Sequence, residues 1–155
     1  MRIDENKDFF IMLEKASRAC GIVEALRMIP FDLQLYKLRL PLDLSESHGI
    51  SIRNLWDRVN GTPRNELKDA SLELSSIGRR YLIEAASLQN KLPKTSDCGF
   101  WYKALLSLTE TELYFEKLEK VDFNVFHRSM RSVTGPRLTY RLFKANRSKK
   151  PILYL

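Results

Sequence analysis

The sequence predicts a mainly helical fold, a bundle of four to six helices that ends in a short C-terminal β-hairpin or a basic arm. The strongest observation lies in residues 63–91, where apolar side chains recur every three or four positions and so share one face of an α-helix. These positions are Leu67, Ala70, Leu74, Ile77, Tyr81, Ala85 and Leu88, and the pattern extends to Leu92. A second stripe of the same spacing lies near the N-terminus and consists of Phe9, Leu13, Ala16, Cys20, Val23 and Leu26.

The length and composition of the chain suit one domain. It has 155 residues, of which 44% are hydrophobic and 29% charged. A chain of this size can bury a core without a metal or a disulfide to support it. We expect a helical bundle domain over residues 1–134 and a basic C-terminal arm over residues 135–155, packed on the bundle or protruding from it.

The first helix is expected from about Asp4 to Met28. Pro30 should end it, because the residue before a proline is pushed out of helical geometry. The following stretch, Phe31–Leu44, fits two structures. Its apolar residues alternate as in a strand, but several of them also fit a helix until Pro41 intervenes. The pattern leaves an extended segment and a broken helix open.

Two helices are expected in the middle of the chain. A short one should run from about Ser51 to Asn60. Thr62 and Pro63 then have the residue types of an N-cap and of a first helical position. They should open the long helix, which reaches about Lys91 and stops before Pro93.

Two more helices are expected after Pro93. One starts at Ser96 or Asp97, reaches about Lys120 and buries its apolar face. Its acids should lie mostly on the opposite, solvated face, and they are Glu110, Glu112, Glu116 and Glu119. Asp122 should cap a shorter helix that ends at about Val133.

Gly135 and Pro136 mark a firm break in the chain. After them Leu138, Tyr140 and Leu142 alternate with residues of the opposite face, as in a strand. Two short strands around a basic turn would make a hairpin that ends in residues 151–155. A helix followed by an apolar tail is the other structure that this segment fits.

Motifs of catalysis and of cofactor binding are absent from the sequence. It has no phosphate-binding glycine loop, no nucleophile elbow and no zinc-protease motif. Its two histidines, His48 and His127, have no second metal ligand at a suitable spacing, and they are interpreted as a loop residue and a helix-surface residue. Cys20 and Cys98 are expected as reduced, mostly buried thiols, with a disulfide as the minority interpretation. We expect no enzyme activity, no cofactor and no metal.

The positive charge of the chain is concentrated near its C-terminus. The net charge is +7, and residues 123–151 include eight basic residues and no acidic one. Arginine binds phosphates through paired hydrogen bonds, and aromatic rings stack on bases. The expected function is therefore nucleic-acid binding, to RNA or a single strand more than duplex DNA, as a subunit of a larger ribonucleoprotein or regulatory complex. The candidate binding residues are Arg128, Arg131, Arg137, Arg141, Lys144, Arg147, Lys149, Lys150, Tyr140 and Phe143.

A protein–protein interaction module or adaptor is the alternative function, in which the chain docks an acidic or hydrophobic partner. The long helix of residues 63–91 and the stretch Phe31–Leu44 would then form a seam with another protein or in a homo-oligomer. The charged N-terminus lacks the apolar run of a secretory signal, and no stretch reaches the roughly 18 apolar residues of a membrane span. The expected location is cytoplasmic or nuclear, not secreted and without membrane contact.

Overall fold

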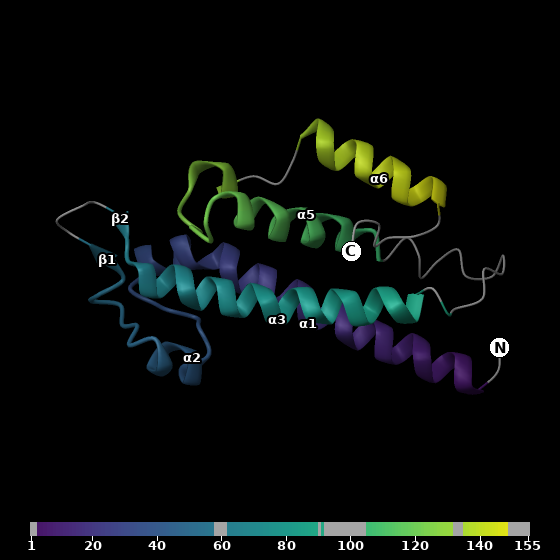
Figure 1. Cartoon of the computed structure of the whole chain (residues 1–155), viewed down its shortest axis with the longest axis horizontal. Helices are drawn as coiled ribbons and strands as arrows, with labels where there is room; N and C mark the ends of the chain where they lie inside the picture. The colour runs from purple at the N-terminus through teal and green to yellow at the C-terminus, as the bar shows by residue number, and fades with distance from the viewer. Residues whose placement is uncertain (1–2, 58–61, 90, 92–104, 132–134, 149–155) are drawn as a thin grey trace.

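The protein is a mainly helical bundle in a computed structural model (Figure 1), and the predicted fold class is confirmed. Three long helices, α1 (Ile3–Gln34), α3 (Asn65–Gln89) and α5 (Ser107–Lys120), form its scaffold. α1 and α3 run antiparallel along the long axis of the molecule, and α5 runs in the direction of α1. The structure describes residues 3–57, 62–89, 91, 105–131 and 135–148.

The core is built by α1, α3 and α5, and α1 and α3 share the largest interface among the described elements. Met12, Leu26 and Ile29 of α1 and Leu82 of α3 are all 0% exposed, and they belong to one hydrophobic cluster. Complete burial of an aliphatic side chain stabilises a fold by roughly 1.5–3 kcal/mol. This pair of helices therefore provides much of the energy that holds the bundle together.

The long helix predicted for residues 63–91 is present as α3, with slightly shorter bounds. Its buried face includes Leu67, Leu74 and Ala85, as the spacing predicted. The face also includes Gly78, where an added Cβ would lie 2.4 Å from Cζ of Phe115. The missing side chain at this position lets the ring of Phe115 pack directly on the backbone of α3.

α1 is longer than predicted, because Pro30 lies inside the helix and does not end it. A proline within a helix removes one backbone hydrogen bond. The neighbouring Ile29 and Asp32 are 0% and 1% exposed, so the burial of this last turn outweighs that loss. The ambiguous stretch Phe31–Leu44 contains no strand and is closer to the broken-helix alternative. It comprises the end of α1, a turn, and the start of a short helix, α2 (Leu42–Ser47).

The helix predicted for Ser51–Asn60 does not form over residues 51–57, and residues 58–60 lie outside the described residues. A turn leads instead into a two-residue strand, β1 (Trp56–Asp57), which pairs antiparallel with β2 (Thr62–Pro63). The side-chain oxygen of Asn54 accepts a hydrogen bond of 2.6 Å from the backbone N–H of Ser51. Local bonds of this kind compete with helix formation. The residues expected to open the long helix therefore lie in β2 instead.

α5 confirms the C-terminal part of the helix predicted up to Lys120, whereas residues 96–104 lie outside the described residues. Its predicted apolar face is buried, with Leu108 at 1% and Phe115 at 2% exposure. The prediction that its acids face solvent is wrong for Glu112, which is 2% exposed.

The helix predicted from Asp122 to Val133 does not form in its described part. Asp122 and Phe123 have φ values of 54° and 52°, in the left-handed region that ends a helix instead of starting one. A short 3-10 helix, η2 (Arg128–Arg131), follows them.

Residues 136–148 form a helix, α6 (Pro136–Ser148), so the predicted hairpin is wrong here and the helical alternative is correct. The second predicted strand, residues 151–155, lies outside the described residues. α6 packs against α5 and runs antiparallel to it (Figure 1). Leu138, Arg141 and Ala145 lie on its inward side, at helical spacing. Spacings of three and four residues were present beside the alternation, and packing on α5 selects the helix.

Candidate protein-interaction surface

The residues expected to bind nucleic acid are distributed over two elements instead of along one arm. Arg128 and Arg131 lie in η2. α6 contains Arg137, Tyr140, Arg141, Phe143, Lys144 and Arg147. Lys149 and Lys150 lie outside the described residues.

Arg137 and Arg141 are bound within the protein. Nη2 of Arg137 lies 2.6 Å from Oε2 of Glu116, and Nη2 of Arg141 lies 2.6 Å from Oε1 of the same carboxylate. The side chain of Arg141 is only 6% exposed, and that of Glu116 is 25% exposed. These ion pairs fasten α6 to α5. Arg137 and Arg141 are therefore structural cations, and Glu116 does not lie on the solvated face that was expected for it.

The outward face of α6 is aromatic as well as basic. Tyr140 and Phe143 are 63% and 62% exposed, so neither is a core residue. Lys144 and Arg147 are exposed on the same helix. Exposed aromatic residues together with arginine are typical of protein interfaces.

Neither histidine has the surroundings of a metal ligand. Nε2 of His48 lies 2.9 Å from Oε2 of Glu73, a carboxylate that sequence reasoning missed, while His127 is exposed on the surface. Cys20 is a half-buried free thiol, and Cys98 lies outside the described residues. In the part of the chain that the structure describes, no three His, Cys, Asp or Glu residues are grouped as metal ligands. No described helix has the length and apolar character needed to cross a membrane.

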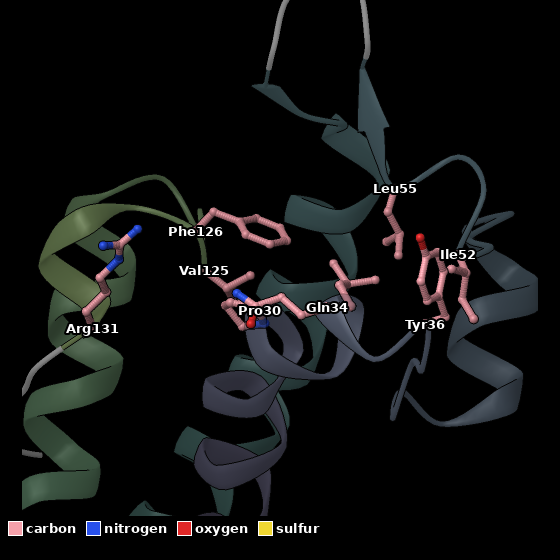
Figure 2. A pocket seen from close by; sticks show the side chains of 9 residues that line it. Pro30, Gln34, Tyr36, Ile52, Leu55, Val125, Phe126 and Arg131 are labelled. Carbon is pink, nitrogen blue, oxygen red and sulfur yellow. The ribbon is translucent and has the colours of Figure 1, made fainter.

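An apolar pocket lies at the end of the bundle where α1 and α5 both terminate (Figure 2). Three segments far apart in the sequence form it: the last turns of α1 with Tyr36 after them, the loop before β1, and the turns after α5 with the end of η2. Its volume is about 430 Å³. The lining residues are Pro30, Leu33, Gln34, Tyr36, Ile52, Leu55, Val125, Phe126 and Arg131.

Exposed apolar side chains extend this pocket onto the surface of the protein. In the pocket lining, Tyr36 is 83% exposed and Ile52 is 42% exposed. Phe31, in the last turn of α1, and Leu35, the residue after that helix, are 58% and 63% exposed. We call the pocket lining together with Phe31 and Leu35 the end surface. Large exposed apolar patches on soluble proteins usually mark interaction sites, so the end surface is a candidate docking site.

Tyr36 has a backbone conformation that tyrosine rarely adopts. Its φ is 53°, and its N–H donates to the carbonyl of Leu33 at 3.1 Å, while the N–H of Lys37 donates to the carbonyl of Asp32 at 2.8 Å. These two bonds form the Schellman motif that closes a helix, in which glycine usually occupies the left-handed position. A tyrosine there costs roughly 1–2 kcal/mol. The side chain is 83% exposed, so the fold gains little packing energy in return.

One charged residue, Arg131, lies among the residues that line the pocket, and no acidic residue does. Arg131 is exposed, as is Arg128 in the same 3-10 helix. Within the described residues neither of these two arginines forms an ion pair. The pocket therefore combines an apolar floor with an available cation at its edge, as Figure 2 shows.

Sequence reasoning found parts of this surface and missed the whole. Arg131 was a candidate residue for binding nucleic acid. The stretch Phe31–Leu44 was a candidate contact with another protein in the alternative function. Ile52 and Val125 were expected to be buried in short helices that do not form. The turns that bring these segments together leave no periodic signal in the sequence.

The chain is similar to proteins named "NADH dehydrogenase (ubiquinone) complex I, assembly factor 6". The Dictyostelium discoideum homolog is 30% identical over 110 residues, which are 70% of this chain and 29% of that protein. The Rattus norvegicus and Homo sapiens proteins are each 27% identical over 113 residues, 73% of this chain and 32% of theirs. The chain thus spans about a third of the length of these relatives. No model of a known protein family matches it, and no solved structure does.

These relatives correct the expected function. Their names describe the assembly of a protein complex and do not mention nucleic acid. The expectation of an RNA-binding ribonucleoprotein subunit, with nucleic acid as its partner, is therefore wrong. The alternative, a protein-interaction module with a protein partner, fits these relatives better. Their names describe assembly and not a catalysed reaction, which agrees in part with the expectation that the chain is not an enzyme. The expected cytoplasmic or nuclear location stays a prediction.

Proposed function

We propose that this chain is a non-enzymatic protein-interaction module that takes part in the assembly of NADH dehydrogenase (ubiquinone) complex I, with the end surface as its docking site. The similarity to proteins named as assembly factors of that complex carries this proposal. An assembly factor must hold a protein partner, and the end surface has the chemistry for such contact.

The exposed apolar groups of the end surface support the docking role. Burial of apolar area stabilises an interface by roughly 25 cal/mol per Å² before the costs of association are subtracted. Phe31, Leu35, Tyr36 and Ile52 are exposed and would each lose contact with water when a partner covers them. Tyrosine is also among the residues that contribute most to binding at protein interfaces.

Complementation of a deletion strain tests the proposal. Deletion of the gene should lower the amount of assembled complex I on native gels, and the wild-type chain in its natural full-length context should restore it. Ile52→Glu and Tyr36→Gly should fail to restore it, because the first places a charge in the apolar contact and the second removes the exposed ring. Ile83→Glu is the matched control, since Ile83 is also exposed, at 55%, but lies in the C-terminal half of α3, away from the end surface.

The Tyr36→Gly variant separates binding from folding. Glycine adopts a positive φ without strain, so the free energy of unfolding of this variant should be unchanged or raised by up to about 1 kcal/mol. Urea denaturation checks this. Normal assembly of complex I in the deletion strain would contradict the proposed function. Full rescue by both end-surface variants would contradict the docking role of that surface.

A further inference from the structure

We infer that the end pocket binds an apolar side chain of a partner peptide, and that a carboxylate close to this side chain in the peptide pairs with Arg131. The inference rests on the proposed docking function and names the chemistry of the partner.

The size and lining of the pocket suit a side chain of a peptide. A volume of about 430 Å³ lies near the lower end of the range of roughly 300–1,000 Å³ that is usual for ligand sites. Leu33, Leu55 and Val125 line the pocket with aliphatic groups, and Phe126 adds an aromatic ring. An apolar group is therefore the part of a ligand that this pocket stabilises.

The surroundings of the pocket indicate a macromolecule and not a small molecule as the ligand. Phe31 and Leu35 are exposed apolar residues outside the pocket lining. A ligand confined to the pocket would leave both in water, whereas a peptide segment anchored in the pocket can extend along the end of α1 toward them. Peptides bind grooves in this way, with a few apolar anchors in pockets and polar groups at the rim.

The charge at the edge of the pocket selects an acidic partner. Arg131 lines the pocket, is exposed, and has no ion pair within the described residues. Arg128 of the same helix is likewise exposed, and Asp122, an acid of the preceding turn, is already bound to Lys68 at 2.9 Å. Complementary charge at an interface sets specificity and speeds association. A basic peptide would meet an unfavourable field here.

Three small probes of one shape and different charge test this chemistry on the full chain: 4-phenylbutyrate, 4-phenylbutanol and 4-phenylbutylamine. NMR titration would follow the methyl groups of Ile52, Leu55 and Val125, which line the pocket. The acid should bind about three- to fivefold more tightly than the alcohol, as expected for one exposed ion pair. The amine should bind more weakly than the alcohol.

Substitution of Arg131 tests whether this residue causes the tighter binding of the acid. In Arg131→Gln the acid should bind no better than the alcohol, while the affinity of the alcohol stays within twofold of wild type. Arg80→Gln, a change of an exposed arginine of α3 outside the pocket, should leave all three affinities unchanged. Equal binding of acid and alcohol by the wild-type chain would overturn the inference, and so would the absence of binding by every probe.

Selection from a displayed library of random twelve-residue peptides tests whether the ligand is a peptide. Enriched peptides should carry Asp or Glu within three positions of Leu, Ile or Phe, and they should lose binding to Ile52→Glu. Enrichment of basic peptides would overturn the inference. Analytical ultracentrifugation of the chain alone tests whether a second copy of the chain occupies the pocket. A dimer that Ile52→Glu converts to a monomer would show that a second copy fills the pocket, and it would overturn the inference of a peptide partner.

The outcomes for the two proposals are separable. If the probes and peptides bind as expected but deletion leaves complex I intact, the binding site stands and the proposed function fails. If deletion impairs assembly but the acid shows no preference over the alcohol, the proposed function stands and the acidic partner is excluded.

Discussion

At the scale of single residues, Gly78 sets the distance between α3 and α5. A methyl group at this position would lie 2.4 Å from Cζ of Phe115 and 3.2 Å from Cγ2 of Ile22. The ring of Phe115 is 2% exposed, so it would have to shift within the core to make room. Gly78→Ala should therefore lower the free energy of unfolding by about 1–3 kcal/mol, the usual cost of overpacking a core. Urea denaturation followed by circular dichroism measures this change.

Gly21 provides the matched control within the same bundle. It also lies inside a long helix, but an added Cβ would have no atom within 4 Å. Gly21→Ala should raise the free energy of unfolding by about 0.5–1 kcal/mol, because alanine loses less conformational entropy in a helix. A rise in the free energy of unfolding for Gly78→Ala as well would show that the contact with Phe115 does not limit the packing of α3.

At the scale of elements, the carboxylate of Glu116 holds α6 against α5 through Arg137 and Arg141. Glu116→Gln should lower the free energy of unfolding by about 1.5–3 kcal/mol, since charged hydrogen bonds are lost beside a buried guanidinium. Trypsin should also cleave α6 more quickly. Glu119→Gln is the control, because its ion pair with Arg79 is at the surface, with Glu119 60% exposed, and should contribute less than about 1 kcal/mol.

The elements that the sequence predicted correctly are those whose packing repeats along the chain. α3 contacts its neighbours over 25 residues, so its apolar spacing is visible from Leu67 to Ala85. The segment around Asn54 is too short for such a repeat, and one side-chain bond to the amide of Ser51 decides its structure. α6 was ambiguous because its inward side includes Arg141, a residue type that indicates exposure unless its partner Glu116 is known.

At the scale of the whole molecule, the end surface exists because α1 and α5 run in the same direction and end together. Both helices end in a non-glycine residue with positive φ, Tyr36 after α1 and Asp122 after α5. The turns that follow bring Ile52 and Val125 to the same pocket as Pro30. The sequence predicted neither the shared direction of the helices nor the turns, because both depend on tertiary packing. The candidate site could therefore be predicted only in fragments, such as Arg131.

The whole molecule should also unfold unevenly, with α6 opening before the α1–α3 pair. α1 and α3 contribute many fully buried apolar residues to the core, whereas the buried residues of α6 are Arg141 and Ala145. Segments with little buried apolar surface open with free energies below that of global unfolding. Hydrogen exchange under native conditions should accordingly show α6 amides exchanging by a local opening, while amides around Leu26 and Leu82 exchange only by global unfolding. Glu116→Gln should speed exchange in α6 more than in α1. A single exchange free energy shared by α1, α3 and α6 would instead show that α6 is part of one cooperative unit with the core.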